Sequence, residues 1–252
     1  MVTFSQAQLD AWLAGILLPF LRVLALFTAA PVLSHRAFPV RARIATAFVI
    51  AVVAAPFAKV PPGTTLAAVS GFGLVAQQVA VGVVLGFAAR LLLAAFELAG
   101  ELIGLQMGLS FAGFFDPAGA GESAVGSWMS TLALMLFVAV NGHLVLVEAV
   151  IDTFRTFPIS ADPLASLATV RLDLLAADMF RIALTIALPA TMLMLFINVV
   201  LGFASRVAPQ LSIFSVGFPV TLLAGLAALA LGTPHLLAPL SEGLAAFLAP
   251  LR

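Results

Sequence analysis

The chain of 252 residues contains no cysteine and few charged residues. Without cysteine it can form no disulfide, no thiolate nucleophile and no cysteine-based metal site, although this absence identifies no compartment. Only 9% of the residues are charged and 63% are hydrophobic, whereas soluble domains are about half apolar. With a mean hydropathy of +1.21, the composition predicts an integral membrane protein.

Basic residues are scarce and unevenly placed. Eleven lysine and arginine residues balance eleven aspartate and glutamate residues, so nucleic acid is not expected as a partner. No basic residue precedes Arg22, so a cleavable secretory signal is not expected at the N-terminus. The only basic cluster, at residues 35–43, is expected on the cytoplasmic side, but later basic residues nearly cancel this bias.

The apolar runs predict an all-α membrane protein with about six long helices arranged in hairpins. A spanning helix needs about 20 apolar residues, and most of the runs meet that length. One run is short for a span, and the longest is expected to form either two helices or one long kinked element. The expected helices cover about residues 6–30, 44–58, 66–108, 132–151, 178–202 and a last one that ends near residue 231.

Arg22 lies deep inside the first apolar run, together with Pro19. An arginine in hydrocarbon costs several kcal/mol unless it is paired or placed in a wet cavity. We therefore expect Arg22 to face protein and to contribute to packing between subunits; snorkelling to the membrane interface is the alternative.

Three charged residues of the third run, Arg90, Glu97 and Glu101, fall on one helix face within about 40° of one another. Such a stripe is expected to be buried in protein, with a structural rather than a proton-conducting role. Glycines beside it recur every four residues, a spacing that lets helix backbones approach closely in membranes. These glycines are Gly82, Gly86, Gly100, Gly104 and Gly108.

A stretch rich in glycine and phenylalanine, GLQMGLSFAGFFDPAGAGES, occupies residues 104–123 between two apolar runs. Glycine leaves a helix at low cost, and Asp116-Pro117 disfavours helix before the proline. A mobile loop with apolar side chains is therefore expected, either as a deformable seal or as a loop that rests on the membrane interface. Its key residues are Gly108, Phe111, Gly113, Phe114, Phe115, Asp116, Pro117, Gly119 and Gly121.

Polar residues also interrupt the later runs. Asn141 and His143 lie within a run that otherwise predicts one clean span, and His143 is followed by Glu148 at a spacing of five, which does not match a zinc-hydrolase motif. No catalytic residue, metal site or cofactor is predicted. Arg206, Pro209 and Gln210 lie at a predicted helix break and, with Asn141 and His143, are expected to pack against other subunits.

Four segments in order carry a family resemblance: LPFLRVLALFTAAPVL, GLSFAGFFDP, NGHLVL and VAPQLSIFSVGFP. Together they resemble the FliR family of bacterial type III export gates, with the last segment closer to flagellar than to injectisome members. The resemblance covers nearly the whole chain of 252 residues as one FliR-type domain.

The resemblance implies a gate in the bacterial inner membrane, within the flagellar basal body. Family members assemble with FliP and FliQ, near FlhA and FlhB, into a pore for unfolded flagellar subunits, with tilted helices and contacts to lipid. It implies N-terminal helices over residues 1–107, a plug loop at 108–127, a middle span and loop at 128–175, and a helix hairpin with a tail at 176–252. The first parts would be FliP-like and the hairpin FliQ-like.

The alternative function is that of a secondary transporter or an ion-channel subunit. Such proteins often contain two related halves with broken helices that meet at an ion site. No convincing internal repeat is found here, and the charged stripe has no counterpart in the second half. An enzyme is not expected, because no nucleophile and base are found in a catalytic arrangement.

Overall fold

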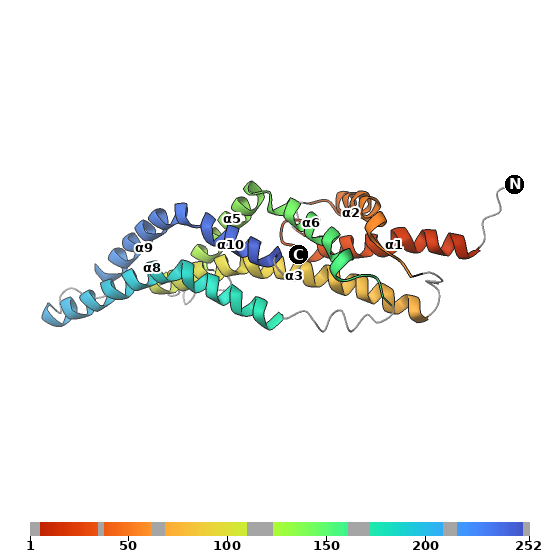
Figure 1. Ribbon diagram of the computed structural model, residues 1–252. Helices are drawn as coiled ribbons and strands as arrows, with labels where there is room; N and C mark the ends of the chain where they lie inside the picture. The colour runs from red at the N-terminus through yellow and green to blue at the C-terminus, as the bar shows by residue number, and fades with distance from the viewer. Residues whose placement is uncertain are drawn as a thin grey trace. The chain divides into compact units, whose positions relative to one another are not determined.

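A computed structural model gives the architecture of the chain (Figure 1). It describes residues 6–34, 38–61, 69–109, 123–160, 172–208 and 216–248. Every regular element in this described part is helical, which confirms the all-α prediction. The helices are α1 (Gln6–Ala29), α2 (Val40–Ala54), η1 (Ala55–Phe57), α3 (Val69–Gln106), α5 (Ala124–Ala139), α6 (Gly142–Thr156), α8 (Leu172–Val207), α9 (Phe218–Gly232), η4 (Thr233–His235) and α10 (Leu237–Leu248).

Five of the described helices are long and apolar enough to cross a membrane, and the count rises to six if the bent pair α5 and α6 forms one span. This agrees with the prediction of about six hydrophobic helices. The C-terminal part, expected as a hairpin and a tail, carries a further helix, α10, after the short turn η4.

The third run forms one continuous helix, α3, rather than two. It contains no proline, and its leucine and alanine residues favour helix strongly enough to offset a cost of about 1 kcal/mol for each interior glycine. At 1.5 Å per residue α3 is about 57 Å long, far more than a hydrocarbon core of about 30 Å.

The run at residues 132–151, predicted as a span interrupted at residues 141–143, consists of two helices, α5 and α6, which meet at a bend of 68° and together form a broken span or a re-entrant pair. Between them Asn141 adopts a left-handed backbone conformation with φ 59° and ψ 28°. Asparagine accepts this conformation more readily than most residues, and it ends a right-handed helix. The carbonyl oxygen of Asn141 then accepts a 2.8 Å hydrogen bond from the backbone N–H of Leu144, in the first turn of α6.

The chain forms two compact units that alternate along the sequence. The first comprises Met1–Leu91, Asn141–Leu175 and Leu244–Arg252, and the second comprises Leu92–Val140 and Ala176–Gly243.

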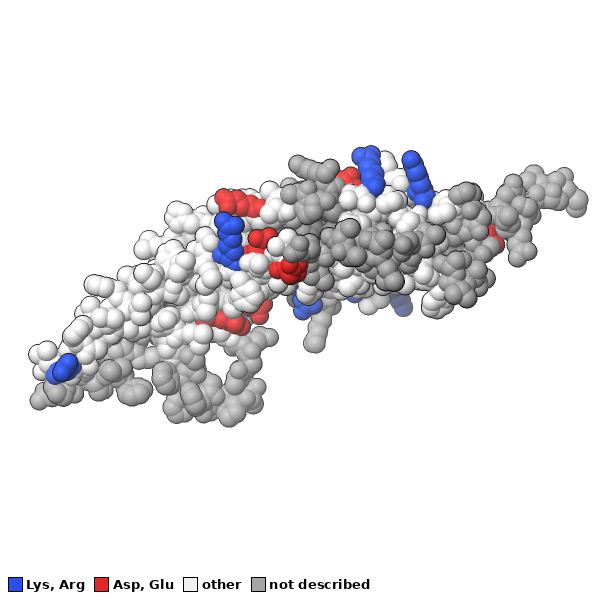
Figure 2. Space-filling view, turned by 60° about the horizontal axis from the view of Figure 1, so that its bottom comes forward, with Lys and Arg blue, Asp and Glu red and all other residues white. Residues whose placement is uncertain are grey.

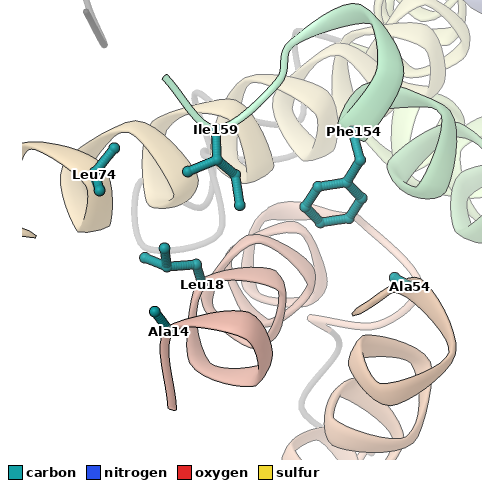
Figure 3. Packing of buried hydrophobic residues seen from close by; sticks show 6 residues of the cluster. All are labelled: Ala14, Leu18, Ala54, Leu74, Phe154 and Ile159. Atoms are coloured by element: carbon teal, nitrogen blue, oxygen red, sulfur yellow. The ribbon is translucent and has the colours of Figure 1, made fainter. Parts of the chain in front are cut away.

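In the first unit, α1, α2, α6 and the first part of α3 enclose an apolar core (Figure 3). Ala14 and Leu18 of α1 and Ala54 of α2 are fully buried in it. Phe154 of α6 lies beside them at 3% exposure. Small alanines on α1 and α2 allow these helices to lie close together, and the larger side chains of Leu18 and Phe154 fill the remaining space.

Much of the surface of the second unit is apolar. On α8 no charged residue occurs from Ile182 to Ser205, a length of about 36 Å at 1.5 Å per residue. Large side chains along it are exposed, among them Met192 at 61% and Phe196 at 67%. Figure 2 shows the corresponding pattern, in which charged side chains are few and wide areas carry none. Such a surface fits a membrane or other apolar partner, and not water.

Candidate functional site

The start of the glycine- and phenylalanine-rich stretch is a helix end. The backbone N–H of Met107 donates to the carbonyl oxygen of Ile103 at 3.0 Å, and that of Gly108 to Leu105 at 3.1 Å. Gly108 has φ 82°, a conformation that L side chains rarely adopt. The predicted exit from the helix at Gly108 is confirmed.

The end of the stretch is also defined. Ser123 caps α5, because its Oγ accepts a hydrogen bond from the backbone N–H of Gly126 at 3.3 Å. A Cβ added at Gly104 of α3 would lie 2.9 Å from this same Oγ. The chain therefore leaves α3 and enters α5 at neighbouring points. The predicted loop residues Phe111, Gly113, Phe114, Phe115, Asp116, Pro117, Gly119 and Gly121 lie outside the described residues.

The four-residue glycine spacing marks close helix contacts, as predicted. In the second unit, a Cβ at Gly100 would lie 2.7 Å from the carbonyl oxygen of Val125, and one at Gly126 would lie 3.0 Å from Cγ of Glu101. In the first unit, a Cβ at Gly82 would overlap the carbonyl oxygen of Arg22, and one at Gly86 would lie 2.6 Å from Cβ of Ala29. The contacts at Gly82, Gly86 and Gly100 are shorter than real Cβ atoms make, so glycine is required at these three positions unless the helices shift.

Arg22 is fully buried and lies at the centre of a polar network in the first unit. Its Nε donates to Oε1 of Gln78 at 2.8 Å, its Nη1 to Oγ1 of Thr153 at 3.1 Å and its Nη2 to the carbonyl oxygen of Phe157 at 2.9 Å. Its Cζ lies 4.1 Å from the centroid of the Phe154 ring, a cation–π contact. The network thus joins α1, α3 and the end of α6.

The prediction that Arg22 faces protein is confirmed, but that protein is its own chain. With every nitrogen of the guanidinium hydrogen-bonded and no surface exposed, Arg22 cannot contact another subunit. Its assignment to subunit packing is therefore wrong.

Gln77 extends the same network and was not singled out from the sequence. Its Oε1 accepts from Nε2 of Gln78 at 3.1 Å, and its Nε2 lies 3.4 Å from Oγ of Ser160. Both glutamines are fully buried. The sequence did contain a signal for this network: two adjacent glutamines inside an apolar helix, whose amides need hydrogen-bond partners when buried.

The stripe of Arg90, Glu97 and Glu101 lies on the continuous helix α3, but the chain does not bury it. Arg90 and Glu97 are exposed, and Glu101 is half-buried against α5 through its contact with Gly126. The exposure of Arg90 and Glu97 is that of the described chain without partners, and burial of the stripe in the assembled complex stays a prediction.

The other residues predicted to pack on subunits are only partly described. Asn141 is exposed at the break between α5 and α6, and Arg206 is exposed in the last turn of α8. His143 is half-buried, and its Nδ1 has no hydrogen-bond partner among the described residues. Pro209 and Gln210 lie outside the described residues.

The long apolar helices define a polytopic α-helical membrane protein. The family model for bacterial export proteins, family 1, matches residues 13–246, almost the whole chain. The chain belongs to this family, that of the flagellar biosynthetic protein FliR, and is a membrane-embedded component of the flagellar export apparatus.

Curated relatives agree with this family. The flagellar biosynthetic protein FliR of Pectobacterium carotovorum is 43% identical over 246 residues, which cover 97% of this chain and 93% of that protein. The FliR of Escherichia coli K12 is 42% identical over 247 residues, again 97% and 93% of the two chains. That of Bacillus subtilis is 30% identical over 210 residues, or 81% and 80%.

Proposed function

We propose that the chain is a subunit of the flagellar type III export gate in the bacterial inner membrane. Together with FliP and FliQ it forms the pore through which unfolded flagellar subunits pass, next to FlhA and FlhB, and it catalyses no reaction. The match to the export family over residues 13–246 is the observation that carries this proposal. Its FliP-like part lies before Ala176, and its FliQ-like hairpin follows.

We propose further that residues 108–127 include the plug of this pore. Its described ends support this proposal: Gly108 follows α3 with a positive φ, and Ser123, which caps α5, lies close to Gly104 of α3. Its phenylalanines supply apolar bulk, which holds back ions by excluding water but forms no specific bond to a passing chain.

The test is the permeability of cells that express the gate. Replacing Phe111, Phe114 and Phe115 with serine wets the constriction, so a small, normally excluded solute leaks in while export continues in part. Replacing Gly113 and Gly119 with bulkier residues stiffens the plug, which slows export without a leak. Protein levels are measured alongside. An intact barrier in a well-expressed loop deletion would show that the segment rests on neighbouring surfaces and is not a plug.

We propose that a partner subunit covers Arg90, Glu97 and Glu101. Charged side chains exposed to hydrocarbon are costly. The charge-free part of α3 from Gly71 to Ala89, about 28 Å long at 1.5 Å per residue, is sufficient on its own for one crossing. The charged part of α3 is then free to lie against protein outside the hydrocarbon layer.

The exposed Arg206 and Asn141, with His143, Pro209 and Gln210, are proposed to contact FliP or FliQ. Site-specific crosslinkers at Arg206 and Asn141 are expected to reach these subunits in intact cells. The exposed Leu195 on the charge-free part of α8 is the control position, where lipid is the expected neighbour. Crosslinks to lipid alone at Arg206 and Asn141 would contradict the assignment.

A further inference from the structure

Met107, the residue that follows α3, is fully buried and is held by helix α9. The hydroxyl Oγ1 of Thr221 lies 3.3 Å from the carbonyl oxygen of Met107, in a buried hydrogen bond between residues 114 positions apart in the sequence. The same hydroxyl lies 3.1 Å from the carbonyl oxygen of Phe218, one turn back in α9, so it donates to either acceptor.

The side chain of Met107 fills a notch in α9. A Cβ added at Gly225 would overlap Cγ of Met107 and would lie 2.6 Å from its Sδ and 2.7 Å from its Cε. Thr221 and Gly225 are four residues apart and therefore share one face of the helix. They are also the buried residues of α9, so the buried face of this helix is the face that receives Met107.

The backbone changes direction directly after this contact. Gly108 follows Met107 with φ 82°, and no other described glycine has a positive φ. The carbonyl of Met107, directly after the last residue of α3, accepts its hydrogen bond from Thr221. The point at which the chain departs from α3 is thus defined by α9 as well as by α3 itself.

We propose that Met107, Thr221 and Gly225 form a latch through which α9 positions the end of α3. The latch sets where residue 108 and its successors begin, and a displacement of α9 moves that point. Met107 and the two residues of α9 are positioning residues, since they act through the segment that follows. If that segment closes the pore, as proposed above, the latch also affects closure; this step alone rests on the proposed function.

The absence of cysteine allows a direct test in the full chain within its native complex. With Leu109→Cys as the only thiol of this chain, the rate at which maleimide labels the chain reports how firmly the end of α3 is held. Gly225→Ala places a methyl group against Met107, and we expect labelling to accelerate about tenfold, the change that corresponds to 1.4 kcal/mol. Gly232→Ala, on the same helix, is the matched control because nothing lies within 4 Å of its added Cβ.

Two further variants separate the latch from general loosening. Thr221→Val removes the donor at nearly constant volume and is expected to accelerate labelling, whereas Thr221→Ser keeps the hydroxyl and is not. Adding Met107→Ala to Gly225→Ala removes the overlapping side chain, so the double variant labels less than the two single effects predict together.

The outcomes distinguish the latch from the plug. If Gly225→Ala and Gly232→Ala label Leu109→Cys at the same rate, the latch is overturned whatever the permeability of the cells. If Gly225→Ala accelerates labelling and opens a leak, both proposals stand. If Gly225→Ala accelerates labelling without a leak, and a strain that lacks the plug residues also keeps its permeability barrier, the latch stands and the plug proposal fails.

Discussion

Nε of Arg22 donates a 2.8 Å hydrogen bond to Oε1 of Gln78, and both side chains are fully buried. The positive charge of Arg22 is surrounded by neutral groups: an amide oxygen, a hydroxyl, a carbonyl oxygen and an aromatic ring. Because each contact comes from a different position along α3 and α6, this one side chain holds three helices of the first unit in register.

Loss of one acceptor of Arg22 is expected to destabilise the first unit. Thr153→Val leaves Nη1 without its partner in a buried site, which costs about 1.5–3 kcal/mol. Thermal unfolding of the purified complex in detergent measures the effect. Thr131→Val is the control, because Thr131 is exposed and its hydroxyl bonds only a carbonyl of its own helix. Equal unfolding temperatures for the two variants would mean that the network does not support the fold.

Lysine is expected to be a poor replacement for Arg22. Its ammonium lacks the planar fork that reaches Gln78, Thr153 and Phe157 at the same time, so Arg22→Lys should lower the yield of folded protein. Arg22→Met removes the charge and leaves three acceptors unpaired. Membrane extraction followed by limited proteolysis measures both variants, and wild-type resistance of Arg22→Lys would contradict the role of the fork.

Gly82→Ala is expected to separate α1 from α3. Its new methyl group would overlap the backbone carbonyl of Arg22, and overpacking of this kind costs about 1–3 kcal/mol. Gly202→Ala should instead be neutral or raise stability by about 0.5–1 kcal/mol, because open space surrounds it in a helix that favours alanine. Unfolding temperatures of the two variants are compared; destabilisation of both by the same amount would argue against a specific contact.

The left-handed conformation of Asn141 predicts which substitutions this position accepts. Asn141→Gly keeps the break between α5 and α6, whereas Asn141→Val forces a β-branched residue to φ 59° at a cost of about 1–2 kcal/mol. Asn198→Val, at an exposed position inside α8, is the control. Thermal unfolding again measures the difference, and a valine tolerated equally at both positions would show that the break does not depend on residue 141.

The charged stripe is expected to act in assembly and not in the folding of the single chain. Arg90→Ala, Glu97→Ala and Glu101→Ala should each lower the yield of complex that co-purifies with FliP and FliQ, because a charge buried against a partner costs about 2–5 kcal/mol once its counterpart is lost. Flagellar assembly is scored in the same cells. Glu148→Ala is the control, from an exposed glutamate on α6. Wild-type yields of the complex for all three variants would contradict a role of the stripe in assembly.

Several features follow from local properties of the sequence. Hydrophobic runs of sufficient length predict membrane helices, since the cost of exposing backbone and apolar side chains accumulates residue by residue. The bounds of α1 and the exit from α3 at Gly108 were predicted in this way. The glycine spacing also predicted close helix contacts, although not which helices would meet.

Two features depend on how helices end and pack, which local sequence does not specify. The spacing of charges predicted that Arg90 and Glu97 share one face of α3; both are exposed in the described chain, and what covers that face in an assembly stays a prediction. The sequence predicted an interruption at Asn141 but not the 68° bend between α5 and α6, because the presence of an asparagine does not specify its backbone conformation.

The sequence by itself determined the class of protein, the approximate helices, the position of the central insertion and the need of Arg22 for protein partners. The tertiary structure alone decided what those partners are. Gln78 and Thr153 lie 56 and 131 residues from Arg22, and Thr221 lies 114 residues from Met107. Hydrogen bonds and notches between such distant residues arise only once helices have packed at a particular register, and local sequence does not specify that register.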